Sequence, residues 1–352
     1  MVLLFMIAAV SCAPSTPDNQ AVTLSAPQVV VNKFTPTASL TPTLTPTLSP
    51  TPNPLMTLVP TLTPTATTDP YLDFYLQTLA DRTYGGGVLQ DAGSLYALGN
   101  FSRRQFKYRS EGLDLYGFLN IPDGEGPFPV IIMLHGYVDP GLYKTVGYSA
   151  RYADALAENG FFVIHPNLRR YAPSEDGPNQ LGIGDTIDIM NLINLVRQQS
   201  GTDGLLKKAD ATRIALWGHS MGGGIVMRTL ILDPQLRGGL LYASIHSDES
   251  VNLSHFDDDG RGVSKLDVPS QVLAFISPSS YLDEITVPMS IHHGSDDTVT
   301  PSEWSDDLCI TLSNLQVEVE CFYYPNQPHT FQNAGDIEFM ENAALFFSRI
   351  LK

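Results

Sequence analysis

Apolar runs that suit buried strands alternate with helical segments through most of the chain, and this alternation restricts the fold more than any other feature. The first long run is PVIIMLHG, which begins at Pro129 and contains no polar side chain before His135. Runs of this kind are typical of parallel strands that are covered on both faces. The sequence therefore predicts an α/β protein with a doubly wound, mostly parallel sheet.

The expected strands and helices follow one another in a regular order. The later strands are FFVIHP, RIALWG, GLLYASIHS, VPMSIHH and QVEVECFYY. The expected helices cover residues 146–159, 185–199, 222–232, 303–312 and 336–351. Right-handed crossovers between parallel strands would place these helices on both faces of the sheet.

The folded domain is expected to span residues 70–352, and three parts of it depart from this order. YLDFYLQTLADRTY has apolar residues at helical spacing, and the glycines at 85–87 end that short helix. RRQFKYRS and DLYGFLNIP are β-rich runs around a turn at 111–112, which predicts an antiparallel hairpin at a sheet edge. The alternation lapses at 248–275, so this segment is a candidate lid over the sheet.

The N-terminal part of the chain has a different composition. Residues 1–12, MVLLFMIAAVSC, are too short to span a bilayer, and the small residues before Cys12 are similar to a bacterial lipoprotein signal. An ordinary cleaved signal and an uncleaved anchor are the alternatives, because Ala9 replaces the usual leucine and a basic region is missing. Repeated Thr-Pro units over residues 13–69 predict an extended stalk or a disordered tail. We therefore expect an exported domain, secreted or lipid-anchored through Cys12 to the membrane.

The net charge limits the expected binding partners of the domain, and its two cysteines are candidates for a disulfide. The formal net charge is −17, from 20 basic and 37 acidic residues, which argues against nucleic acid or an anionic bilayer surface as a partner. Cys309 lies on an expected helix and Cys321 on the strand that follows it. In an exported protein they are a candidate disulfide, but sequence alone leaves the pairing open.

The strongest functional signal is the motif Gly218-His219-Ser220-Met221-Gly222, which follows the run RIALW and opens a helix. On such a turn the serine backbone is strained and its hydroxyl stands clear of the sheet. Side chains at the two glycine positions would collide with neighbouring backbone. The helix N-terminus supplies free N–H groups, so the Met221 N–H is placed to bind an oxyanion. We interpret Ser220 as a nucleophile; a chance Gly-Ser turn is the alternative.

A serine hydroxyl needs a base, and in this arrangement the acid and then the histidine follow the serine in the chain. Asp297 in HHGSDDTVTP follows the strand VPMSIHH and is the predicted acid, with Asp296 as the alternative. His329 is the only histidine after Asp297 and is the predicted base. The second oxyanion donor is expected from Tyr137, where the neighbouring Gly136 allows close approach.

The other histidines are expected to have supporting positions. His219 lies inside the motif and should pack beside the turn, and one of His292 and His293 is expected to support the acid loop. None of the histidines has a helical metal-ligand spacing with a carboxylate partner, so we expect neither a catalytic metal nor a cofactor.

Together these residues resemble the prolyl oligopeptidase-like branch (peptidase S9 catalytic domain) of the α/β-hydrolases. The motifs that carry the resemblance are YGGG, YGFLNIP, LHGY, NLRRYAPS, LWGHSMGG, ISPSSYLDEITVP, HHGSDDTVTP and QPHTF. The resemblance implies the α/β-hydrolase fold and cleavage of peptide or ester bonds through an acyl-enzyme. It implies Ser220 as nucleophile, His329 as base and then acid, and Asp297 as the group that orients the histidine. Tyr137 and Met221 would form the oxyanion hole.

The sequence also departs from the family pattern. Residues 71–102 are too short to build the family's propeller domain, so peptidase specificity is not inherited. Arg170 and Val138 replace glycines that are usual in the family, which affects the expected substrate pocket and not the triad. The expected substrate is a small ester or a short peptide, and the choice between them stays open, as does the oligomeric state. A catalytically inactive domain used for binding or surface attachment is the alternative function.

Overall fold

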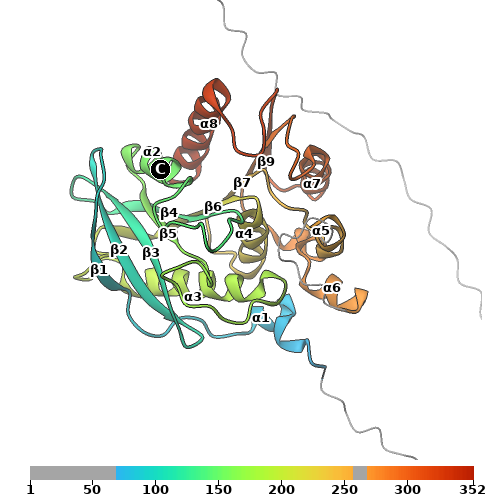
Figure 1. Ribbon diagram of the computed structural model, residues 1–352, viewed down its shortest axis with the longest axis horizontal. Coiled ribbons are helices and arrows are strands. Elements are labelled where there is room, and N and C mark those ends of the chain that lie inside the picture. The colour runs from blue at the N-terminus through green and yellow to red at the C-terminus, as the bar shows by residue number, and fades with distance from the viewer. Residues whose placement is uncertain (1–68, 257–267) are drawn as a thin grey trace, which may run out of the picture. The chain divides into compact units, whose positions relative to one another are not determined.

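The computed structural model describes residues 69–256 and 268–352. The signal segment, Cys12, the stalk and the central part of the candidate lid lie outside the described residues. The described part is a sheet with helices on both faces (Figure 1). No helix in this part has the length and apolar character needed to cross a membrane.

The described residues form a sheet of nine strands in the order β1-β2-β3-β5-β4-β6-β7-β8-β9. The strands are β1 (Gln90–Leu95), β2 (Phe101–Ser110), β3 (Leu113–Pro122), β4 (Phe128–Leu134), β5 (Phe162–Pro166), β6 (Ala209–His219), β7 (Gly239–Tyr242), β8 (Met289–Gly294) and β9 (Val319–Tyr324). β1, β2, β3 and β5 pair antiparallel, and every pair from β5 to β9 is parallel. The predicted fold class, including the N-terminal hairpin of β2 and β3, is confirmed.

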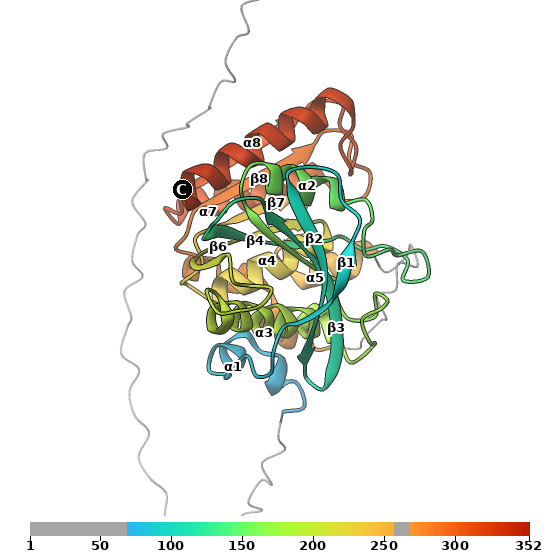
Figure 2. The ribbon, with the colours of Figure 1, turned by 90° about the vertical axis from the view of Figure 1, so that its left-hand side faces the viewer.

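Helices cover both faces of the sheet. They are α1 (Leu76–Ala80), α2 (Ala150–Glu158), α3 (Ile183–Gln199), α4 (Met221–Leu232), α5 (Glu249–Phe256), α6 (Ser270–Ile276), α7 (Ser302–Asn314) and α8 (Asn333–Leu351). α2 and α8 pack on one face, and α3, α4 and α7 pack on the other (Figures 1 and 2). Both faces of the central strands are therefore withdrawn from water.

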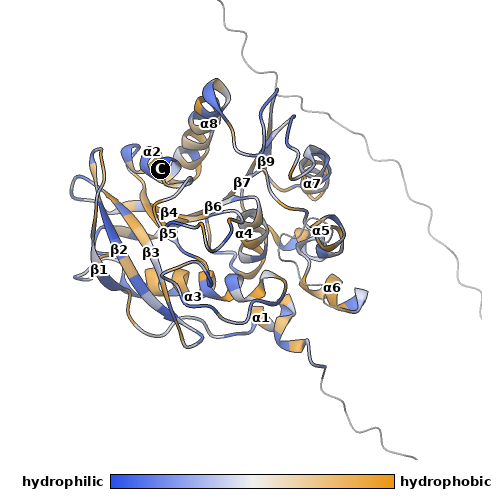
Figure 3. Cartoon of the chain, in the orientation of Figure 1, coloured by the Kyte–Doolittle hydropathy of each residue, from blue (hydrophilic) through white to orange (hydrophobic). Residues whose placement is uncertain are grey.

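The central strands are apolar because they have two cores to fill. Along β4, Val130 and Ile132 belong to the core under α3 and α4, whereas Ile131 and Met133 belong to the core under α2 and α8. Successive side chains of a strand point to opposite faces, so a strand between two cores needs an unbroken apolar run. Figure 3 shows this difference: β4 and β5 are mostly hydrophobic, whereas β2 and β3 mix hydrophilic and hydrophobic residues.

The sequence analysis missed β1, which lies outside the predicted hairpin at the edge of the sheet. Most of its residues are exposed, and the register with β2 shifts between Asp91 and Gly93. An exposed edge strand needs no apolar pattern, so hydrophobic periodicity carries no signal for it.

The segment at 248–275 was expected to leave the strand-helix alternation, and its described parts are the helices α5 and α6. Arg228 of α4 connects to both of them. Its guanidinium forms a buried ion pair with Glu249 of α5, and its Nε atom donates to the carbonyl of Ile276 in α6 (3.1 Å). This arginine therefore ties the start of α5 and the end of α6 to the main domain.

Cys309 of α7 and Cys321 of β9 form a disulfide, with 6.5 Å between their Cα atoms. The helix packs directly on β8 and β9. The pairing that the sequence left open is thus present in the structure.

Candidate active site

Ser220 lies on the sharp turn between β6 and α4, with φ 53° and ψ −118°. A positive φ is strained for a non-glycine residue and persists only where the surroundings enforce it. Here the N–H of Ser220 donates to the carbonyl of Tyr242 (2.9 Å), and its own carbonyl accepts from the N–H of Gly223 (2.9 Å). The turn is therefore held by backbone hydrogen bonds on both sides of the serine.

The two glycines of the motif are required for steric reasons, as predicted. A Cβ atom at Gly218 would lie 2.4 Å from the carbonyl oxygen of Gly222, and a Cβ atom at Gly222 would lie 2.3 Å from the carbonyl oxygen of Leu134. Both contacts are with backbone atoms, which have no freedom to move aside. The motif thus brings α4 closely against β4 and β6 at the serine.

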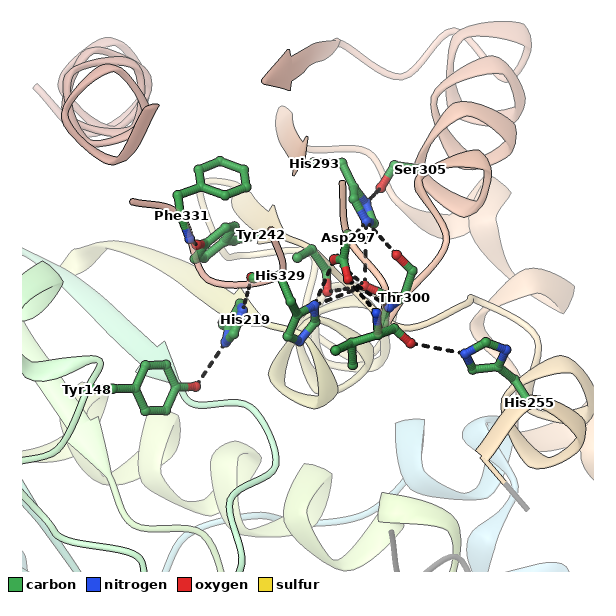
Figure 4. Close-up of polar contacts among 12 residues, drawn as sticks. Tyr148, His219, Tyr242, His255, His293, Asp297, Thr300, Ser305, His329 and Phe331 are labelled. Carbon is green, nitrogen blue, oxygen red and sulfur yellow. Dashed lines mark hydrogen bonds and ion pairs between the residues drawn. The ribbon is translucent and has the colours of Figure 1, made fainter. Parts of the chain in front are cut away.

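Asp297 and His329 meet in the loops that follow β8 and β9 (Figure 4). The Nδ1 atom of His329 lies 2.7 Å from Oδ2 of Asp297. The other carboxylate oxygen of Asp297 accepts the backbone N–H groups of Val299 (2.7 Å) and Thr300 (3.0 Å). Asp296, the alternative acid, is exposed and contacts the hydroxyl of Ser295. The structure therefore places Asp297, and not Asp296, against the histidine.

The carboxyl of Asp297 is held in its ionised form. Burial opposes ionisation, but hydrogen bonds from His293 and His329, with the positive charge that His329 can carry and the Thr300 N–H, outweigh it. The net result is a pKa of Asp297 well below its ordinary value. A carboxylate in this position accepts the Nδ1 proton of His329, so Nε2 is left as the basic atom of that ring.

The loop after β4 passes close to the serine. A Cβ atom at Gly136 would lie 3.1 Å from the Cβ atom of Ser220. The N–H of Gly136 already donates to the hydroxyl of Tyr148 (2.7 Å). The oxyanion donor expected from this loop is the next backbone N–H, that of Tyr137. The structure thus brings this loop to the serine; the oxyanion roles of Tyr137 and Met221 stay predictions.

His219 was expected only to pack beside the turn, and it does more than that. Its ring lies 4.7 Å from the ring of His329 and 4.4 Å from that of Tyr242, measured between centroids. Its two nitrogens contact Tyr148 and the backbone of His329 (Figure 4). The sequence offered one signal for this role, namely a polar ring at a buried position between two required glycines.

The segment NLRRYAPS contains a buried ion pair that the sequence analysis did not assign. Arg169 contacts both carboxylate oxygens of Asp188 on α3, at 2.7 and 2.8 Å. Arg170 has φ 73°, in the left-handed region that favours glycine. The backbone at 170 thus keeps a glycine-like conformation, which agrees with the glycine that the motif resemblance led us to expect there.

Comparisons with known proteins agree with the fold described above. The family model described as the alpha/beta hydrolase fold matches residues 129–261. Pyrococcus horikoshii acylaminoacyl peptidase is similar in structure, with a TM-score of 0.60 and 22% identity over 72% of this chain and 43% of that one. Acetyl xylan esterase 1 from Thermoanaerobacterium has a TM-score of 0.56 and 18% identity over 80% of this chain and 92% of that one. At such identities these likenesses show the fold.

Among curated sequences, the uncharacterized peptidase YuxL of Bacillus subtilis is 23% identical over 245 residues, which cover 66% of this chain and 36% of that protein. The chain spans less than half of the length of the curated relatives that it matches. The family model and the similar solved structures confirm the α/β-hydrolase fold that the resemblance of the sequence motifs implies. The strand order, the turn at Ser220 and these comparisons together show that this chain is a protein of the α/β-hydrolase fold.

Proposed function

We propose that this chain is a serine hydrolase that cleaves carboxylic ester or short peptide bonds with Ser220, Asp297 and His329. The observation that carries the proposal is the 2.7 Å contact between Asp297 and His329, in loops at the same end of the sheet as the strained turn of Ser220. Ligands of open α/β sheets bind at the carboxyl ends of the strands. Relatives and similar structures that include peptidases and esterases support a hydrolase.

Each group has a defined part in the proposed reaction. His329 takes the proton of the Ser220 hydroxyl through Nε2, while Asp297 holds the Nδ1 proton and stabilises the imidazolium. The serine oxygen attacks the substrate carbonyl, and the N–H groups of Met221 and Tyr137 stabilise the oxyanion. His329 then gives its proton to the leaving alcohol or amine. Water releases the acyl group from Ser220 by the same sequence of transfers.

The experiment is active-site labelling of the domain at 69–352 with a fluorophosphonate, followed by turnover of short esters and aminoacyl arylamides. We expect one label on Ser220, loss of labelling and turnover in Ser220→Ala, and wild-type behaviour in Ser279→Ala, which changes an exposed serine. Arylamide turnover would assign a peptidase, and ester turnover alone an esterase. A folded wild-type domain without labelling would contradict the proposal and favour a binding module.

We further propose that Cys12 is lipidated and that the stalk holds the domain at the outer face of a membrane. The support is the sequence before Cys12 and the Thr-Pro repeats after it. The full chain should then fractionate with membranes and carry a mass increase on its N-terminal peptide. Cys12→Ser should remove both; a membrane-bound Cys12→Ser protein would contradict lipidation.

A further inference from the structure

Tyr148 and His219 connect the two loops that flank Ser220. The N–H of Gly136 lies 2.7 Å from the hydroxyl oxygen of Tyr148, and that hydroxyl lies 2.9 Å from Nδ1 of His219. The Nε2 atom of His219 lies 3.0 Å from the carbonyl oxygen of His329 (Figure 4). One continuous line of hydrogen bonds thus runs from the loop after β4 to the loop after β9.

The direction of each hydrogen bond in this line follows from one fact. A carbonyl oxygen only accepts, so Nε2 of His219 must carry the proton that it donates to His329. In a neutral imidazole the other nitrogen, Nδ1, is then an acceptor, and the Tyr148 hydroxyl must donate to it. The oxygen of Tyr148 is left to accept the Gly136 N–H. The whole line therefore has one consistent assignment of protons.

The surroundings keep His219 neutral. Burial disfavours the charged ring and the nearby His329 adds to this effect, so the pKa of His219 is lowered to about 3. The neutral form of His219 matters because His329 becomes a positively charged imidazolium during the proposed reaction. A second positive ring at 4.7 Å would oppose that charge.

We propose that Tyr148 and His219 are positioning residues for hydrolysis, which set the oxyanion loop and the His329 loop at their working separation. This inference rests on the proposed function. By occupying the Gly136 N–H, Tyr148 fixes the orientation in which the loop presents the N–H of Tyr137. By holding the carbonyl of His329, His219 fixes the backbone from which that imidazole reaches Asp297. Small displacements of such groups lower the rate of the chemical step more than they weaken binding.

Four variants test the line of hydrogen bonds by steady-state kinetics on the ester that the wild type turns over. Tyr148→Phe and His219→Phe keep an aromatic ring at each position and remove the polar atoms, and each should lower kcat by about 10- to 100-fold with KM within about twofold. The double variant should be no worse than His219→Phe alone, because both changes break the same line. His219→Gln should recover part of kcat, since its amide N–H can still donate to His329.

Tyr143→Phe is the matched control, because Tyr143 lies in the same loop but its hydroxyl contacts Asn167 (3.0 Å). It should leave kcat within about twofold. An active wild type with unchanged kcat in folded Tyr148→Phe and His219→Phe would overturn the inference and leave the proposed function intact. A folded wild type that neither labels nor turns over ester would instead overturn the proposed function.

A second measurement does not depend on enzymatic activity. In ¹⁵N-labelled wild-type protein at neutral pH, His219 should appear as the neutral Nε2–H tautomer. The signal can be assigned by its absence in His219→Gln. An Nδ1–H tautomer or a charged ring would contradict the line of hydrogen bonds and the inference with it.

Discussion

The Nε2 atom of His293 lies 3.2 Å from Oδ2 of Asp297, the same carboxylate oxygen that contacts Nδ1 of His329 at 2.7 Å. His293 is fully buried near the end of β8. Its Nε2 also faces the carbonyl of Thr300 (2.9 Å), and its Nδ1 contacts the hydroxyl of Ser305 (2.6 Å). Because Nε2 faces two acceptors, it carries a proton, and His293 contacts the same oxygen of Asp297 that His329 contacts.

We therefore predict that His293→Phe lowers kcat/KM by about 10-fold, equivalent to about 1.4 kcal/mol of transition-state stabilisation. The reason is that Asp297 loses a donor that fixes its carboxylate. His292→Phe is the control, since His292 contacts Ser290 and Tyr324 (both 2.8 Å) instead of the acid. The test is to measure kcat/KM of both folded variants by steady-state kinetics. Equal decreases of kcat/KM in the two variants would show that general packing is responsible.

Asp297→Asn should lower kcat by roughly 10³- to 10⁴-fold, because the amide cannot hold the imidazole in the required tautomer or stabilise its charge. Asp296→Asn removes the same charge from the adjacent exposed residue and should leave kcat within about twofold. The two rates, measured on one ester, compare the two acids that the sequence left as candidates. A larger loss in Asp296→Asn would reverse the assignment.

Asp185 provides a prediction for pH. Burial, and then the charge of Asp188, raise the pKa of Asp185 to about 7. Between the unfolded value of 3.8 and this value, the folded state binds a proton that the unfolded state has released. The resulting stabilisation is fully present below the unfolded pKa and is lost as pH rises through the folded pKa.

Asp185→Asn removes this titration but keeps an acceptor for the Asn179 amide, which lies 2.6 Å from Oδ2. The unfolding free energy of the wild type should fall relative to the variant by about 2–3 kcal/mol between pH 5 and pH 8. Urea unfolding at both pH values measures the difference. Parallel stabilities across this range would contradict the raised pKa.

The disulfide between Cys309 and Cys321 should stabilise the domain by about 2–3 kcal/mol through closure of a short loop. Cys309→Ser with Cys321→Ser should lower Tm by roughly 5–10 °C, and reductant should do the same to the wild type. Alkylation followed by mass measurement counts free thiols directly. Two thiols labelled in unreduced protein would show that the bridge is absent.

Sequence patterns predicted the features that depend on neighbours along the chain. An unbroken apolar run indicates a strand between two cores, and glycines at 218 and 222 indicate a strand-to-helix turn, because both constraints act within a few residues. The order serine, acid, histidine then limited the candidates to Ser220, His329 and two adjacent aspartates. β1 was not predicted, because an exposed edge strand carries no apolar pattern.

The tertiary structure alone decided which polar side chains meet. His219 and His329 are 110 positions apart in the sequence, and they touch because the order β6-β7-β8-β9 brings the ends of these strands together. The choice between Asp296 and Asp297, and between His292 and His293, depends on which way each side chain leaves its backbone. Local pattern determined the strands and the turn, whereas hydrogen bonds between distant loops depend on how the strands are ordered in the sheet.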